Sequence, residues 1–233
     1  MISPATTTGL LGIGLYTIAD TAELLRTSPR MIRRWMAGYD YRRDGKTRHI
    51  DPLWSPELPQ PDGDTELSFR DLIELRFVRA FTGIGLDLRT IRSCLDLARD
   101  CVQSDRPFSS GRFRTDGQTI FLEGLKASDD PVLLDLKRRQ YVLKGVLDQT
   151  FRDLDIEHDA VARWRPFHGK RSIVIDPDRS FGQPIAAEFG VPTLVLADAV
   201  EAEGSVARAA ALYEVDASVV RDAVKFQREL TAA

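Results

Sequence analysis

The chain has 233 residues, of which 43% are hydrophobic and 29% charged, and its formal net charge at pH 7 is -3. This composition is ordinary for a soluble globular protein of one or two domains. The apolar run at residues 10–16 is interrupted by glycines and is too short to span a bilayer, and no basic segment precedes it, so the sequence argues against a membrane span or a secretory signal.

The two cysteines favour a reducing compartment. Cys94 and Cys101 are seven residues apart in one predicted helix. That spacing corresponds to about 10 Å along the helix axis, which is too far for a disulfide. We therefore expect a cytoplasmic protein with free thiols.

The first predicted elements are two short helices after a flexible leader at residues 1–15. Residues 17–25 carry a helical apolar stripe, and Thr17 with Asp20 matches a capping box. Ser28 caps the second helix, with Pro29 at its first position, and Gly38 ends it.

Residues 39–50 predict a basic hairpin that turns at Asp44 and Gly45. Helix, turn, helix and basic hairpin form the order of a winged helix-turn-helix, a fold that binds double-stranded DNA. In the second helix, Trp35 shares its face with other apolar residues and is expected to support the helix from the core.

Positive charge is concentrated in this region. Residues 26–50 contain eight Lys or Arg against two Asp, a local net charge of +6 in an acidic chain. The blander interpretation is a solvated surface, with one or two of the cations paired to Asp40 or Asp44. The expected DNA contacts are Arg30, Arg33 and Arg34 on the helix, and Arg42, Arg43, Lys46 and Arg48 on the hairpin.

The middle of the chain predicts further helices and a second hairpin. Prolines mark residues 52–61 as an irregular connection, Ser68 and Asp71 cap a helix at residues 68–81, and Asp87 begins another. Residues 107–123 are interpreted as a hairpin that turns at Asp116 and Gly117. Residues 131–151 predict a helix whose apolar positions fit either a dimer seam or packing within the chain.

The C-terminal part predicts a strand at residues 171–177 and helices at residues 194–203, 205–212 and 217–230, with Ser205 and Asp216 as caps. Between residues 198 and 222 there are six acids and two bases, a charge that would repel a duplex and suits a protein partner or self-association. The fold expected is mainly α with short β hairpins. Its expected regions are the leader at 1–15, a winged-helix region at 16–100, a hairpin and dimerisation helix at 101–160, and a small helical domain at 161–233.

The residues argue against an enzyme. The three histidines and two cysteines lack the spacing of a metal site, and neither a hydrolase triad signature nor a phosphate-binding loop is present. We expect no metal and no cofactor.

Two resemblances add to this interpretation. Residues 16–35 and 68–98 resemble the winged helix of MerR-like proteins, with Arg33 and Trp35 at the family's Arg-x-aromatic positions. Residues 173–226 resemble a helical domain of unknown function, family 433, found in antitoxins of VapBC-like modules. The second resemblance rests on Asp176-Pro177, Gly182-x-Pro184, residues 191–193, Gly204 and residues 215–226, and it departs from the family at residues 186–189.

These resemblances imply a DNA-binding antitoxin of a type II toxin–antitoxin module. Such a protein would bind its operator as a homodimer, repress its own operon, and bind and inhibit a PIN-like ribonuclease toxin. Two alternatives stay open: a MerR-type regulator that senses a small organic ligand, and an interaction adaptor without a DNA role.

Overall fold

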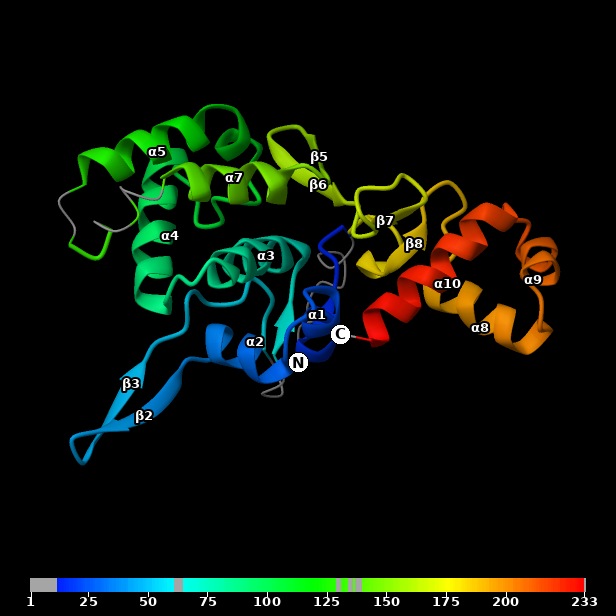
Figure 1. The fold of residues 1–233 in the computed structure, drawn as a ribbon, viewed down its shortest axis with the longest axis horizontal. Coiled ribbons are helices and arrows are strands. Elements are labelled where there is room, and N and C mark those ends of the chain that lie inside the picture. Colours follow the sequence, from blue (N-terminus) through cyan, green and yellow to red (C-terminus); the bar gives the residue numbers. More distant parts are fainter. Residues whose placement is uncertain (1–11, 61–64, 129–130, 134–135, 137–139, 233) are drawn as a thin grey trace, which may run out of the picture.

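The computed structural model describes residues 12–60, 65–128, 131–133, 136 and 140–232. The chain is mainly helical, with short antiparallel sheets, as the composition and periodicity predicted. Figure 1 shows the N-terminal helices below the central helix α3, the middle of the chain above it, and the C-terminal helices to the right.

The N-terminal elements follow the capping signals. Thr17 and Asp20 form the predicted capping box, and the Ser28 side chain accepts the Met31 backbone N–H at 3.3 Å. Strand β1 pairs with β4, and β2 pairs with β3 as a separate hairpin. The elements are β1 (Tyr16–Thr17), α1 (Ile18–Leu24), α2 (Pro29–Met36), β2 (Tyr39–Arg43), β3 (Lys46–Ile50) and β4 (Glu66–Leu67).

The central layer consists of α3 (Phe69–Gly83) and α4 (Leu88–Val102). The predicted caps are present: Ser68 and Asp71 form a capping box, and the Asp87 carboxylate accepts the Thr90 N–H at 2.7 Å. Stacked and edge-on phenylalanine rings fill the space above α3, with Phe77 and Phe108 only 4.5 Å apart between centroids. Cys94 and Cys101 are free thiols, as expected.

The predicted hairpin at residues 107–123 is wrong. Residues 113–127 are helical, as a short π-helical turn (Phe113–Gly117) that continues into α5 (Gln118–Ala127). Phe113, Gly117, Phe121 and Leu125 recur every four residues and are all buried, so they form one helical face. A Cβ on Gly117 would lie 2.5 Å from Val102 of α4, which shows that this glycine permits close helix packing and does not form a turn.

Helix α7 (Gln140–Phe151) packs against α3. Its apolar face was expected to form either a dimer seam or a contact within the chain. Leu143, Leu147 and Phe151 are buried within the chain, so these positions do not form a dimer seam. Residues 131–133 form a turn, so the helix expected from residue 131 does not begin there.

The chain then forms a four-stranded antiparallel sheet in the order β5-β6-β7-β8. Strand β7 was predicted, whereas the hairpin β5–β6 and strand β8 were not. The expected boundary after residue 160 falls inside β6, and the one after residue 100 falls inside α4. The strands are β5 (Leu154–Glu157), β6 (Ala160–Trp164), β7 (Ile173–Ile175) and β8 (Pro184–Ala186).

Three helices complete the chain close to their predicted positions: α8 (Thr193–Glu203), α9 (Val206–Tyr213) and α10 (Ala217–Thr231). Their small core consists largely of alanine and valine. Ser205 and Asp216 occupy the N-cap positions, but neither side chain makes a capping hydrogen bond.

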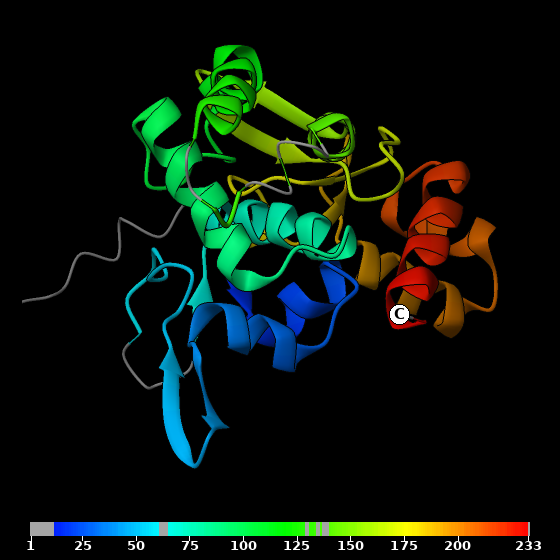
Figure 2. The same cartoon turned by 60° about the vertical axis from the view of Figure 1, so that its left-hand side comes forward.

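The C-terminal part is docked on the N-terminal helices. The Tyr16 hydroxyl donates to the Gly182 carbonyl at 2.9 Å, and Leu24 of α1 packs against an apolar cluster that includes Phe226 and Leu230 of α10. Figure 2 shows α10 beside α1 from a second direction.

The expected leader at residues 1–15 needs correction at its end. Residues 1–11 lie outside the described part. Residues 13 and 15 are held by the backbone hydrogen bonds Phe69 N–H to Ile13 carbonyl and Leu15 N–H to Phe181 carbonyl, so they belong to the fold. In the part of the chain that the structure describes, no helix is both long and apolar enough to cross a bilayer.

Candidate nucleic-acid interface

Helix α2 separates an apolar face from a basic one. Ile32 and Trp35 are fully buried, which confirms Trp35 as a core residue. Arg30, Arg33 and Arg34 lie on the exposed face of the same helix. The segment therefore presents three guanidinium groups while its apolar side chains hold the helix against the body.

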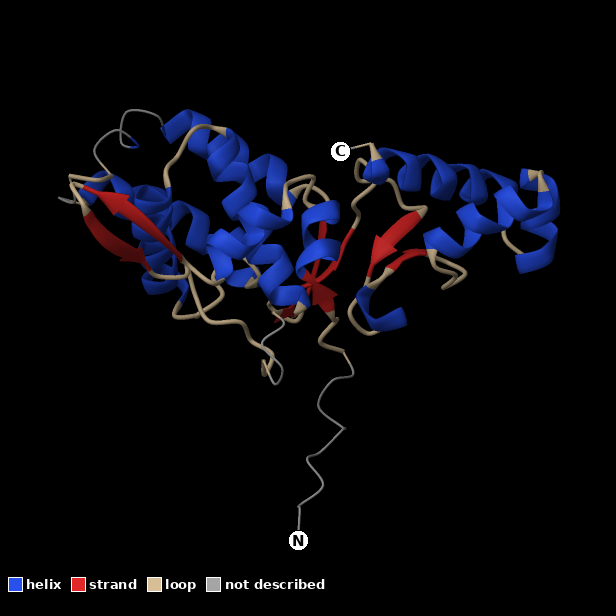
Figure 3. Ribbon diagram, turned by 90° about the horizontal axis from the view of Figure 1, so that it is seen from below, coloured by secondary structure: helices blue, strands red, loops and turns tan. Residues whose placement is uncertain are grey.

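The β2–β3 hairpin projects away from the helices in Figure 1, and Figure 3 shows it from below. It turns at Asp44 and Gly45, which have φ angles of 54° and 72°, the left-handed values that a two-residue hairpin turn needs. This confirms the predicted turn.

The strand register distributes the hairpin cations over two faces. Tyr41 lies opposite Arg48, and Arg42 opposite Thr47. Because side chains alternate along a strand, Lys46 and Arg48 occupy one face and Arg42 the other. All three are exposed. Arg43 belongs to β2, and its side chain lies outside the described part of the structure.

Tyr39 connects α2 to the hairpin and was not singled out in the sequence. The guanidinium carbon of Arg34 lies 3.8 Å from the centroid of the Tyr39 ring, within the range of a cation–π contact. A Cβ on Gly38 would lie 2.3 Å from the Ile50 carbonyl oxygen, and the φ angle of Gly38 is 72°, so only glycine allows this tight exit from α2.

Among the described side chains, five of the other expected cations have no counter-ion. Among the described residues, Arg30, Arg33, Arg42, Lys46 and Arg48 form no ion pair, and Asp40, which we considered as their partner, bonds to His49 at 2.7 Å. Exposed, uncompensated cations on a helix and an adjoining hairpin are suited to binding phosphate groups.

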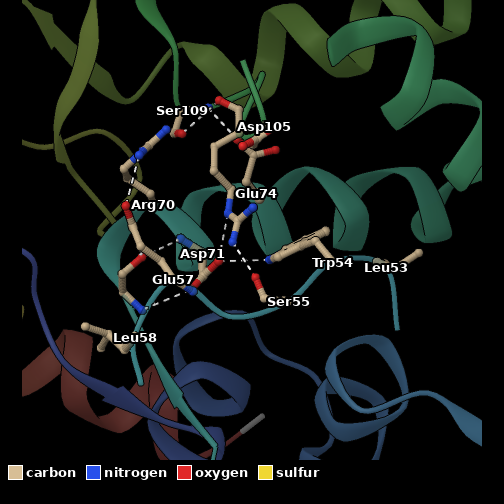
Figure 4. A network of polar contacts seen from close by, with 12 residues as sticks. Leu53, Trp54, Ser55, Glu57, Leu58, Arg70, Asp71, Glu74, Asp105 and Ser109 are labelled. Carbon is tan, nitrogen blue, oxygen red and sulfur yellow. Dashed lines mark hydrogen bonds and ion pairs between the residues drawn. The ribbon is translucent and has the colours of Figure 1, made fainter. Parts of the chain in front are cut away.

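A buried polar network holds the segment that follows the hairpin (Figure 4). The Asp71 carboxylate accepts hydrogen bonds from Trp54 Nε1 at 2.8 Å, from the Glu57 N–H at 2.9 Å and from Arg106 Nε at 2.9 Å. Arg106 also donates to the Ser55 carbonyl at 2.6 Å. The sequence assigned Asp71 only a capping role, and nothing local pairs it with Arg106, 35 residues away. Through these bonds α3 and the chain after α4 hold residues 54–57, which follow the hairpin.

Glu74 lies one turn further along α3 and is buried, and its two carboxylate oxygens differ in their hydrogen bonding. Oε1 accepts the Ser109 N–H at 2.8 Å, whereas Oε2 has no hydrogen-bond partner in the described structure. Burial raises the pKa of Glu74 from 4.5 to about 7, against the opposing effect of the Ser109 hydrogen bond.

Stability should therefore fall as pH rises through this range. The folded state binds the Glu74 proton more tightly than the unfolded state does. This proton binding therefore contributes about 3 kcal/mol to the free energy of unfolding below pH 4.5, and the contribution is lost by about pH 7. The substitution Glu74→Gln should remove this pH dependence and make the protein more stable than wild type at pH 8. Urea unfolding at pH 5 and pH 8 measures both, with the exposed Glu123→Gln as control. Equal pH dependence in wild type and Glu74→Gln would contradict the assignment.

The described residues contain no group of three or more His, Cys, Asp or Glu side chains that could hold a metal ion. The N-terminal region exposes positively charged side chains on a well-packed helix, α2, and on its adjoining hairpin.

Comparison with known proteins reveals similarity over most of the chain, although no family model matches it. A Mycobacterium tuberculosis H37Rv protein named "Putative antitoxin VapB45" is 26% identical over 223 residues, covering 91% of this chain and 93% of the relative. The crystal structure of Rv2018 from Mycobacterium tuberculosis superposes with a TM-score of 0.71 at 23% identity, covering 92% of this chain and 99% of that one. The chain therefore shares its fold with Rv2018 along nearly its whole length, and its sequence is related to that of an antitoxin-named protein.

Proposed function

We propose that this protein is a DNA-binding antitoxin of a type II toxin–antitoxin module. The observation that carries the DNA-binding part is the set of exposed cations without counter-ions on α2 and the β2–β3 hairpin. The relative named as an antitoxin supports the module. In this proposal the chain acts by binding and has a regulatory role, not an enzymatic one.

The N-terminal region would act as a winged helix-turn-helix of the MerR-like kind. Its α2 would enter the major groove, where Arg30, Arg33 and Arg34 reach base edges or phosphates, because arginine matches the acceptors of guanine. The hairpin would serve as the wing, with Lys46 and Arg48 on one face and Arg42 on the other against flanking phosphates, and with Arg43 as a further contact. A homodimer on a palindromic operator would then repress the operon.

The C-terminal region, residues 161–233, would bind the toxin, a PIN-like ribonuclease, with the family-433 resemblance as its basis. Exposed hydrophobic side chains support a protein-directed role, since Leu194 of α8 is 57% exposed and Leu212 of α9 is 62% exposed. Exposed acids accompany them, with Asp198 and Glu201 on α8 and Glu214 at the end of α9.

Coexpression with the adjacent gene product tests the proposal. If that product is a nuclease, the protein should copurify with it and restore growth to cells that express it. Leu212→Glu should reduce the copurified nuclease at least about tenfold, because it places a charge in an apolar contact. The matched control is Ile120→Glu, at an exposed position of α5. Growth inhibition that persists with the full-length protein present would refute the antitoxin role.

A second function is favoured by one groove. It has a volume of about 360 Å³ and lies between α1 and the C-terminal helices, with Leu15, Leu24, Leu194 and Leu230 among its walls. A mainly apolar groove of this kind would suit the MerR-type alternative, in which a small organic ligand alters DNA affinity. Ligand-dependent DNA binding that requires no nuclease partner would support this alternative over the antitoxin.

A further inference from the structure

Helix α10 carries a row of cations on its outer face, and only one of them, Arg221, falls within the acidic stretch at residues 198–222. Arg221, Lys225 and Arg228 follow one another at four and three residues and are exposed, so they lie on one side of the helix. Lys170, from the loop before β7, joins them, because Lys170 and Lys225 both lie over the Phe167 ring, at 4.7 and 5.9 Å from its centroid. We call Lys170, Arg221, Lys225 and Arg228 the α10 stripe.

The acids of this surface lie beneath the cations. Lys170 bonds to Asp222 at 2.8 Å, with side-chain exposures of 50% and 25%. Lys225 lies 4.0 Å from Glu229, with exposures of 66% and 25%. Arg221 and Arg228 form no ion pair in the described part of the chain. The surface that solvent meets is therefore positive, although residues 198–222 as a whole are acidic.

One end of the stripe lies beside the turn that precedes α2 of the proposed DNA-binding surface. Glu229 of α10 pairs with Arg26 at 3.0 Å, and Arg26 belongs to the turn between α1 and α2. His168 bonds to the same carboxylate at 3.0 Å. The end of α10 therefore adjoins the turn that leads into α2.

We propose that the α10 stripe binds the phosphate backbone of DNA that flanks the operator, as a second contact beyond α2 and the hairpin. This inference rests on the proposed DNA-binding function. Arg221 to Arg228 spans about 10 Å of helix, which equals the rise of about three phosphates of one strand along the duplex axis, at about 3.4 Å per base pair.

A nucleic acid fits this face better than a protein does. No large hydrophobic side chain of α10 is exposed among its described residues, whereas protein interfaces have an apolar centre and are depleted in lysine. Phosphate contacts, in contrast, are made by exposed Lys and Arg side chains and do not require exposed apolar surface. The C-terminal part would then use two surfaces, α8 and α9 for the protein partner and α10 for DNA.

The test uses full-length protein and a duplex that covers the promoter of its own gene, together with shorter duplexes trimmed from both ends. The stripe variant is Arg221→Gln/Lys225→Gln/Arg228→Gln. Its matched control, Lys126→Gln/Lys144→Gln/Arg208→Gln, removes the same charge from exposed positions on α5, α7 and α9. Affinity is measured by fluorescence anisotropy over a series of salt concentrations.

We expect the stripe variant to bind the long duplex at least about tenfold more weakly than wild type and to lose about 2–3 from the slope of log affinity against log salt. Trimming the flanks should reduce wild-type affinity to that of the stripe variant and leave the variant unchanged. The conservative Arg221→Lys/Arg228→Lys should keep the wild-type slope, because phosphate binding requires charge and not a particular geometry.

Equal salt slopes for the stripe and control variants on the long duplex would overturn the proposal. So would a stripe variant that keeps its DNA affinity and loses the nuclease, since the stripe would then belong to the protein interface. Failure of the proposed function is distinct: in that case Arg33→Ala/Arg34→Ala would leave binding to every duplex unchanged.

Discussion

Replacing Arg33 and Arg34 together by alanine should weaken binding to the operator duplex about 100-fold, or roughly 3 kcal/mol. Both side chains are exposed on α2, next to the fully buried Trp35. A bidentate arginine contact with a base edge contributes about 1–3 kcal/mol, and a phosphate contact contributes less. Gel shifts or anisotropy with an operator duplex and a scrambled duplex measure the change.

A charge-matched control variant and the scrambled duplex distinguish sequence-specific base contacts from general electrostatic attraction to DNA. Lys126→Ala/Lys144→Ala removes the same charge from α5 and α7 and should change the affinity by less than about threefold. Loss on the operator with little loss on the scrambled duplex indicates base contacts. An unchanged gel shift would show that α2 is not the recognition helix.

Asp71→Ala should lower the free energy of unfolding by about 3–5 kcal/mol. The Asp71 side chain is fully buried and accepts hydrogen bonds from two separate segments of the chain, residues 54–57 and Arg106, and its removal leaves the buried guanidinium of Arg106 without its ion-pair partner. Since folded domains are stable by only about 5–15 kcal/mol, this loss is a large share of the total. Urea unfolding followed by circular dichroism provides the measurement.

Asp96→Ala is the matched control for this effect. Asp96 also pairs with an arginine, Arg99 at 2.9 Å, but its side chain is 69% exposed. Exposed ion pairs contribute about 0–1 kcal/mol, so this variant should stay near wild-type stability. A loss below 1 kcal/mol for Asp71→Ala would show that the network does not anchor the hairpin segment.

Local sequence patterns predicted most of the helices and hairpins that begin or turn at a capping or turn residue. The caps at Thr17, Ser28, Ser68 and Asp87 and the turn at Asp44 and Gly45 depend on residues within four positions of one another. Such short-range hydrogen bonds and backbone preferences are readable in a sequence because their partners are fixed by chain connectivity.

The same local reasoning was wrong where packing decided. Asp116 and Gly117 have the composition of a turn, yet the segment is helical because Phe113, Phe121 and Leu125 bury one face and Gly117 allows contact with α4. Glycine favours a turn because its backbone is flexible, and it favours close helix packing because it has no side chain. The prediction failed because only the neighbours of Gly117 in space distinguish these two roles.

The sequence by itself determined the basic region at residues 26–50, the helices that flank it and the absence of a disulfide. Only the tertiary structure decided which charges stand alone and which are neutralised. It paired Asp71 with Arg106 and Arg26 with Glu229, at separations of 35 and 203 residues, and it placed the cations of α10 outside their acids. The physical reason is that Coulomb interactions and desolvation depend on distance and burial in space, which net charge along a chain does not record.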